Sequence, residues 1–143
     1  MRWIVVCLLV VACGNKPAAR HATPEIPVTG TATFAGTWLT NDEVDWFYRL
    51  IVAPDGRFGL TIERGKMGSC EQGGSLTPGK GPSAFLLTLT KDSCAPDGSP
   101  LGGSLLVSIP SYTGDALTLM YLVGETQIRR SYTRDPKIPR PAQ

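Results

Sequence analysis

The sequence lacks most of the side chains from which catalytic and metal sites are built. Its 143 residues contain one histidine, His21, and four cysteines. Because His21 precedes the region that we expect to fold, no Ser-His-Asp or Cys-His nucleophilic site can be assembled in the body of the chain. A zinc site with four Cys or His ligands is excluded for the same reason. We therefore expect no catalytic residue, no metal and no cofactor.

One acidic cluster, Asp42, Glu43 and Asp45, precedes a predicted strand. Such carboxylates could bind Ca²⁺ or act as an acid pair. We interpret them as a solvated loop, because acidic side chains in turns are usually exposed for backbone and solvation reasons.

Charge and long apolar runs are also scarce. Charged residues make up 18% of the chain, and the net charge is +2. The excess of cations comes from the two ends, with Lys16 and Arg20 before the body and Lys137 and Arg140 after it, so nothing resembles a basic nucleic-acid-binding face. The apolar run from Trp3 to Ala12 has about half the length that a membrane-spanning helix needs. It is typical of an export signal.

The residues Val10-Val11-Ala12-Cys13 resemble the lipobox of bacterial lipoproteins. In that motif a small residue lets the signal peptidase reach the bond before the cysteine, whose thiol accepts a diacylglyceryl group. The resemblance implies that residues 1–12 are removed as a signal peptide and that Cys13 carries palmitate-type acyl chains. The protein would then be anchored to a membrane of the bacterial cell envelope, facing a compartment such as the periplasm. Gly14, where an inner-membrane lipoprotein would have Asp, favours the outer membrane. A plain secretory signal with an incidental cysteine is the alternative.

The remaining chain divides by composition. Residues 13–33 are rich in Pro, Ala and Thr and have no apolar period, which indicates a flexible linker. Residues 34–135 form the expected domain. Residues 136–143 contain three prolines and are predicted to be a disordered tail.

Cys70 and Cys94 are the two cysteines of the body. In an exported domain an even pair most simply forms a disulfide. Closing a loop of about 25 residues would stabilise the fold by roughly 3–4 kcal/mol in the chain-entropy model. A redox pair normally has closer spacing, as in Cys-x-x-Cys, and a zinc site lacks further ligands.

Apolar residues of the body recur with a period of two, which predicts strands and no helix of useful length. The clearest segments are 46–53, 57–63, 84–90, 104–109 and 116–123, with a Gly-rich, weak or bulged strand within 67–77. With the opening segment 34–39 and the closing segment 127–134, this gives about eight strands joined mostly by short turns. We predict an all-β fold, an antiparallel meander that closes into a small barrel. A β-sandwich is the alternative.

The two ends of the body resemble the calycin superfamily, which contains the lipocalins and the intracellular fatty-acid-binding proteins. Phe34-Ala35-Gly36-Thr37-Trp38 is similar to their opening Gly-x-Trp segment, and Arg130-Ser131-Tyr132-Thr133-Arg134 to their closing strand. The lipocalin resemblance implies that Trp38 plugs the barrel base and that Arg129 or Arg130 lies across it. The Arg-x-Tyr of fatty-acid-binding proteins implies that Arg130 and Tyr132 hold a ligand carboxylate. Alternatively, Arg130 faces solvent or covers Trp38.

These observations predict a membrane-anchored envelope lipoprotein that binds a small hydrophobic or amphipathic ligand without catalysis. The candidate ligand-binding residues are Phe58, Phe85, Leu105, Arg130 and Tyr132. The alternative is a protein-interaction lipoprotein, such as an inhibitor of an envelope hydrolase or an accessory subunit. It would have a solid core and use the segments 66–81 and 92–103. A weak hydrolase built from loop carboxylates is a third reading.

Overall fold

A computed structural model describes residues 23–43, 45–95, 104–123 and 125–138, with only the backbone described for residues 41–43. The predicted export signal, Cys13 and the first part of the linker lie outside the described residues, as does the end of the tail. Two short 3₁₀ helices are η1 (Thr31–Phe34) and η2 (Gly65–Met67). No helix in the described part of the chain is long and apolar enough to cross a membrane. The eight strands are β1 (Gly36–Glu43), β2 (Trp46–Val52), β3 (Arg57–Arg64), β4 (Ser69–Pro78), β5 (Ala84–Asp92), β6 (Ser104–Tyr112), β7 (Ala116–Val123) and β8 (Thr126–Arg134).

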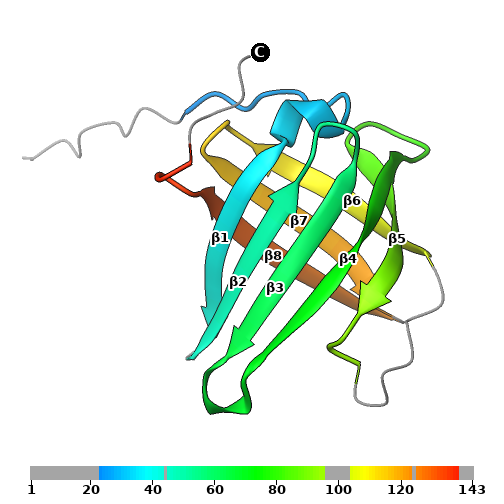
Figure 1. Ribbon diagram of the computed structural model, residues 1–143. Coiled ribbons are helices and arrows are strands. Elements are labelled where there is room, and N and C mark those ends of the chain that lie inside the picture. The colour runs from blue at the N-terminus through cyan, green and yellow to red at the C-terminus, as the bar shows by residue number, and fades with distance from the viewer. Residues whose placement is uncertain (1–22, 44, 96–103, 124, 139–143) are drawn as a thin grey trace, which may run out of the picture.

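The strands form a closed antiparallel barrel in which each pairs with the next along the chain (Figure 1). The barrel closes where β8 returns to β1, with Trp38 opposite Arg134 and Leu39 opposite Thr133. Closure pairs the first strand with the last, so each of the described strands has a neighbour on both sides, which favours this arrangement for a short meander. The predicted all-β barrel of about eight strands is confirmed, it is consistent with a lipocalin-like fold, and the β-sandwich alternative is wrong.

The alternation in the sequence determines which side of each strand is buried. In β2, Tyr48, Leu50 and Val52 are buried, whereas Arg49 and Ile51 are exposed. Successive side chains of a strand point to opposite faces, so the apolar set enters the barrel and the other set meets solvent.

β4 contains the predicted irregularity. Its register with β5 shifts between Gly73 and Gly74. A Cβ on Gly74 would lie 1.9 Å from the carbonyl oxygen of Thr88, so only glycine fits this close approach. The shift changes which residues of β5 point inward: beyond it, Lys91 faces out and Asp92 is buried.

Cys70 and Cys94 form the predicted disulfide, which is confirmed. Their Cα atoms lie 5.0 Å apart. The bond joins the start of β4 to the residues that follow β5. Next to it, the amide of Ser93 donates to the carbonyl of Glu71 at 2.8 Å, so the β4–β5 pairing continues to the end of β5.

One end of the barrel is closed by η1 and the side chains beneath it. Trp38 is fully buried, and its Nε1 donates to the carbonyl of Phe34 at 2.9 Å. Tyr112 packs edge-on against Trp38 and donates from its hydroxyl to the carbonyl of Thr33 at 2.8 Å. Phe34 is also buried, and its ring packs edge-on against the ring of Phe85 at this end of the barrel. We call this the closed end.

The guanidinium that covers Trp38 belongs to Arg134, at 4.2 Å from the ring centre. The prediction named Arg129 or Arg130, and the strand register explains the difference. Arg134 is the residue opposite Trp38, Arg130 lies about 13 Å further along β8, and Arg129 is exposed on the outer face.

Part of the predicted linker packs onto the barrel. The amide of Ile26 donates to the carbonyl of Tyr112 at 2.7 Å, and Val28 is 7% exposed within the core. Thr31 then donates from its hydroxyl to the carbonyl of Pro54 at 2.9 Å. The packed domain therefore begins before Phe34, because these residues cover apolar surface at the closed end.

Candidate ligand-binding cavity

The interior of the barrel contains a cavity of about 310 Å³. It extends from Phe34 at the closed end to Val123 at the opposite end, where Val123 is 49% exposed. We call this opposite end the far end. The walls come from η1 and from the inward faces of β2 to β8: Phe34, Trp46, Tyr48, Leu50, Phe58, Leu60, Ile62, Gln72, Leu76, Phe85, Leu87, Leu89, Leu105, Val107, Ile109, Leu119, Tyr121, Val123, Ile128, Arg130 and Tyr132.

The cavity walls are predominantly apolar. The three apolar residues named from the sequence, Phe58, Phe85 and Leu105, all line this one cavity although they come from β3, β5 and β6. A cavity of this size with apolar walls and a few polar groups is the usual form of a small-molecule site. The barrel core is therefore not solid, which is the property that separates the two leading functional readings.

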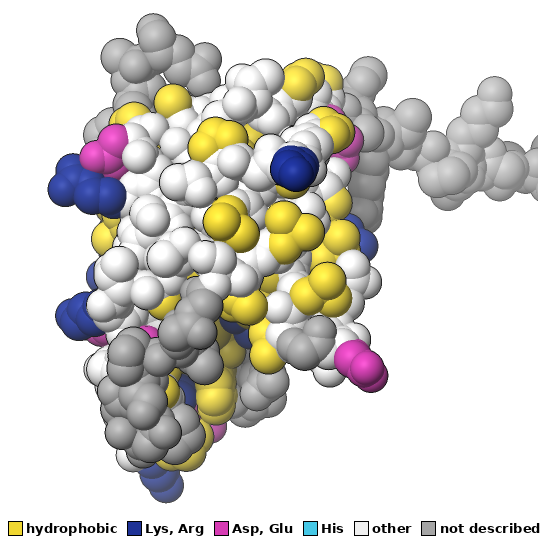
Figure 2. Space-filling view, turned by 90° about the vertical axis from the view of Figure 1, so that its right-hand side faces the viewer, with side chains coloured by type: hydrophobic (Ala, Val, Ile, Leu, Met, Phe, Trp, Pro, Cys, Tyr) yellow, Lys and Arg dark blue, Asp and Glu magenta, His cyan; other side chains and the backbone are white. Residues whose placement is uncertain are grey.

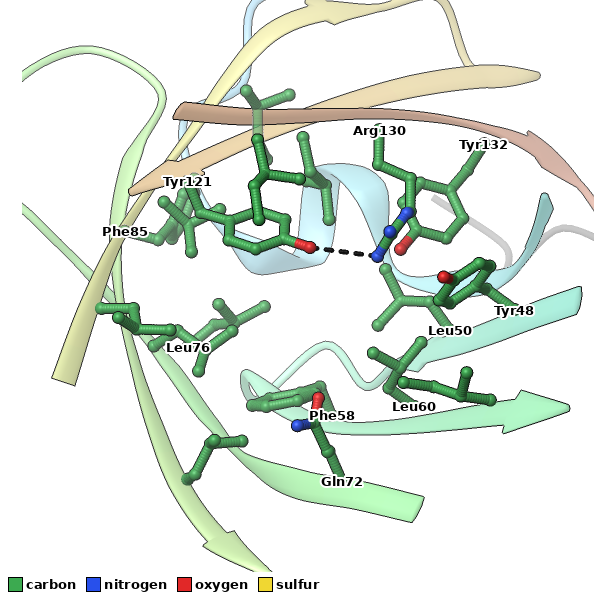
Figure 3. A pocket seen from close by; sticks show the side chains of 18 of the residues that line it. Tyr48, Leu50, Phe58, Leu60, Gln72, Leu76, Phe85, Tyr121, Arg130 and Tyr132 are labelled. Carbon is green, nitrogen blue, oxygen red and sulfur yellow. Dashed lines mark hydrogen bonds between the residues drawn. The ribbon is translucent and has the colours of Figure 1, made fainter. Parts of the chain in front are cut away.

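Arg130 brings a positive charge into these walls. Its Nη1 donates to the hydroxyl of Tyr121 at 3.0 Å, and its guanidinium lies 3.9 Å from the centre of the Tyr48 ring. Tyr132, two residues further along β8, lines the same cavity. Figure 3 shows the three tyrosines around Arg130 at one side of the cavity. The guanidinium is thus oriented by a ring face and a hydroxyl, an arrangement that suits a planar, weakly hydrated cation.

The sequence-based candidates missed the two residues that orient Arg130. Tyr48 and Tyr121 contact it directly, and Gln72 adds an amide to the opposite wall. Both tyrosines belong to segments that the alternation predicts as strands, 46–53 and 116–123. The alternation does not give their distances from Arg130. The contact of Tyr48 on β2 with Arg130 on β8 depends on closure of the barrel through β1.

The other candidate residues that the sequence analysis named are not among the described residues that line the cavity. Arg129 is exposed. Most of the segment 66–81 belongs to β4, and residues 96–103 lie outside the described part. Asp45 occupies the β1–β2 turn with a φ of 70°, and the side chains of Asp42 and Glu43 are not described. Within the described ranges, no three His, Cys, Asp or Glu side chains gather as a metal site would need.

Two carboxyl groups with shifted pKa values lie on the outer surface. The side-chain hydrogen bond from Lys91 lowers the pKa of Glu71, and the charge of Lys91 adds to the effect. The backbone amide of Arg57 lowers the pKa of Asp55 in the β2–β3 turn. Both carboxyl groups lie on exposed side chains of the outer surface, so these shifts describe surface pairs and not the cavity.

Comparison of the chain with protein-family models, with curated protein sequences and with solved structures found no match.

Proposed function

We propose that this chain is an envelope lipoprotein whose barrel binds a small hydrophobic or amphipathic ligand without catalysis. The observation that carries the proposal is the apolar cavity with one oriented guanidinium. A chain or ring system would occupy the apolar walls, and a carboxylate or another acceptor would meet Arg130 and its tyrosines. Charge-assisted hydrogen bonds of this kind are roughly twice as strong as neutral ones.

The calycin resemblance supports this proposal. Gly36, Trp38 and Arg134 meet at the closed end as an opening Gly-x-Trp and a last-strand arginine would in a lipocalin. Arg130 and Tyr132 face the interior as the Arg-x-Tyr of a fatty-acid-binding protein would. The barrel therefore combines a sealed base with a cavity that is polar at one place.

Anchoring is the second part of the proposal. Cys13 follows a signal-like apolar run within a lipobox-like motif, and acylation there would hold the domain on the outer membrane. Metabolic labelling with palmitate tests this part. We expect label in the wild type and none in Cys13→Ala, and an unlabelled wild type would refute anchoring.

Native mass spectrometry tests ligand binding. The chain would be exported behind a general secretory signal with Cys13→Ala, so that its disulfide forms and no acyl group is attached. We expect an additional mass that organic solvent releases. A clean apo mass that persists after incubation with envelope lipids would overturn the carrier function.

A matched pair of variants links the ligand to the cavity. Leu105 lines the cavity, whereas its neighbour Leu106 is 52% exposed on the outer face. Leu105→Trp should fill the cavity and remove the additional mass, and Leu106→Trp should retain it. Equal ligand content in the two variants would place the ligand elsewhere.

A protein-interaction function is the second candidate, favoured by apolar side chains on the outside. Leu86 and Leu106 are direct cross-strand neighbours with exposures of 40% and 52%, and Leu122 on β7 is 47% exposed. Figure 2 shows hydrophobic side chains among mostly uncharged ones on the side of the barrel where β5 lies. Crosslinking in the envelope, with Leu106→Glu as the variant, tests it. A crosslinked partner that Leu106→Glu removes would favour this function.

A further inference from the structure

Three leucines form a row across the outer face of the barrel. Leu86 on β5 is paired directly with Leu106 on β6, and their exposures are 40% and 52%. The pairing of Val107 with Tyr121 brings Leu122, the next residue of β7, beside Leu106. Leu122 is 47% exposed. We call these three side chains the leucine row.

The face around the leucine row carries mostly uncharged side chains (Figure 2). Inward residues of β5, β6 and β7 belong to the cavity wall or the core, and the outward set alternates with them. No outward position has a charged side chain in the described segments 84–90, 104–110 and 116–122. Charges return at the flanks, where Glu71 on β4 is paired with Lys91 and where Arg129 on β8 is exposed. These flanking charges leave an excess of one cation.

The hydroxyl side chains on this face have hydrogen-bond partners within the barrel. Thr88 Oγ1 and Ser104 Oγ lie 3.0 Å apart, between β5 and β6. The other outward hydroxyls bond to a neighbouring strand in the same way: Thr90 to Gly73, Ser108 to Met120 and Thr118 to Ser131. The antiparallel ladders engage the backbone groups beneath. Removing water from polar groups costs less when their hydrogen bonds are already made, so this face is suited to an apolar environment.

The linker reaches the barrel on the strand that carries the middle leucine. The amide of Ile26 donates to the carbonyl of Tyr112, the last residue of β6, and Ile26 is 41% exposed. Leu106 lies about 20 Å from Tyr112 along the same strand. The chain from Cys13 to Ile26 spans at most about 45 Å when fully extended. An acyl group on Cys13 would therefore hold β6 close enough for the leucine row to reach the same bilayer.

The leucine row also adjoins the far end of the cavity. Leu122 is followed by Val123, which lines the cavity there and is 49% exposed. A surface that covers the leucine row would therefore lie beside this end of the cavity. A lipid surface is itself a source of the amphipathic molecules that we propose as ligands, so this position favours lipid over a protein partner.

We infer that the face with the leucine row lies against the lipid surface to which Cys13 is attached. This inference rests on the anchoring part of the proposed function. The leucines enter the boundary between headgroups and acyl chains, and Arg129 at the flank attracts anionic lipids. The far end of the cavity then lies at the lipid surface, where a ligand enters.

Brominated lipids quench tryptophan fluorescence within the bilayer, so they report which face of the anchored protein meets lipid. Acylated wild type, Leu106→Trp and Ile51→Trp would be reconstituted into vesicles of phosphatidylethanolamine and phosphatidylglycerol. Ile51 is 49% exposed on the outer face of β2 and is the matched control. After subtraction of the wild-type signal, we expect the brominated lipid to quench the added tryptophan of Leu106→Trp and not that of Ile51→Trp.

Partitioning of the full exported chain without its anchor, with Cys13→Ala throughout, measures the contribution of the face itself. Leu106→Thr should weaken binding to the same vesicles by about fivefold, because the exposed part of this side chain no longer enters an apolar layer. Ile51→Thr should leave binding unchanged. Threonine is β-branched and both positions are exposed, so both variants should fold as wild type does.

The outcomes separate this inference from the proposed function. Quenching confined to Leu106→Trp, together with weaker partitioning of Leu106→Thr, supports it. Equal quenching at the two positions, or equal partitioning of Leu106→Thr and Ile51→Thr, overturns it, and ligand binding in the cavity stands or falls by native mass spectrometry. A protein crosslink that Leu106→Glu removes, without vesicle binding by wild type, also overturns it and assigns the leucine row to a protein partner. An unlabelled wild type in the palmitate experiment refutes the anchoring and this inference together.

Discussion

The guanidinium of Arg134 lies over the ring of Trp38, 4.2 Å from its centre, and so joins the last strand of the barrel to the first. Its Nε donates to the carbonyl of Gly114 at 2.7 Å, and Nη1 donates to the carbonyl of Ala35 at 3.2 Å. One side chain thus joins the last strand, the β6–β7 turn and the start of β1. The residues that seal the closed end are therefore coupled to the residues that close the barrel.

Arg134→Ala should lower the free energy of unfolding by about 2–4 kcal/mol, because it removes the cation–π contact and leaves buried carbonyls without their donor. Urea unfolding measures this. Arg129→Ala removes an exposed arginine of the same strand and should change stability by no more than about 0.5 kcal/mol. Similar losses in the two variants would refute the assignment of Arg134.

Gly36→Ala should destabilise the fold by about 2 kcal/mol or more. Gly36 has a φ of +142°, and a Cβ there would lie 2.3 Å from Nη1 of Arg134. Gly59→Ala is the control, since a Cβ at Gly59 meets nothing within 4 Å. We expect wild type and Gly59→Ala to unfold at similar thermal midpoints, and Gly36→Ala to unfold at a clearly lower temperature. A midpoint for Gly36→Ala at or above that of Gly59→Ala would contradict this account.

The double variant Cys70→Ala, Cys94→Ala should lose about 3–4 kcal/mol of stability, the value expected for a closed loop of this length. Denaturant unfolding with and without a reducing agent measures the loss. Reduced wild type should match the double variant. A wild type whose stability does not respond to reduction would show that the bond contributes little.

Arg130→Gln should change ligand selectivity and not only stability. Wild type is expected to bind decanoic acid more tightly than decanol by about tenfold, because a guanidinium meets the carboxylate in a largely apolar site. Arg130→Gln should remove that ratio, whereas Arg129→Gln should keep it. An unchanged ratio in Arg130→Gln would show that the acid head does not contact Arg130.

The pKa of Glu71 should be lower than that of an ordinary glutamate, because Lys91 donates a hydrogen bond to its carboxylate. A folded-state pKa below the unfolded value contributes stability above the unfolded pKa, and that contribution is lost as the pH falls through the folded pKa. Lys91→Met should therefore raise the pKa of Glu71 in an NMR titration. Lys66→Met is the control and should leave the pKa of Glu71 unchanged. If Lys91→Met does not raise the pKa of Glu71, the pairing of these two side chains is refuted.

Most of the fold could be predicted from the sequence, because the information is local. Period-two alternation predicted strands at 46–53 and 57–63, and the structure has Tyr48, Leu50 and Val52 buried on one face of the first. The short turn between these strands contains Gly56, with a φ of 89°. The disulfide was predicted from the even pair of cysteines in the body and from the export that the first residues lead us to expect. These features depend on residues that are close in the sequence, so they can be predicted without knowing how distant strands pair.

The site could be predicted only in part, because its geometry depends on register. Arg130 was a candidate, yet its contact with Tyr48 joins β8 to β2, two strands that lie far apart in the sequence. The choice of Arg134 over Arg130 at Trp38 depends on the pairing of β8 with β1.

The seam between β1 and β8 is short, with two opposed residue pairs. It joins the first strand to the last, so the barrel has the longest possible separation in sequence at its point of closure. In a chain that is synthesised from its N-terminus, the free edge of β1 stays unpaired until the residues of β8 have been made. Completion of the C-terminal strand is therefore the event that ends exposure of this edge, and loss of that strand would leave seven strands open to association with other chains.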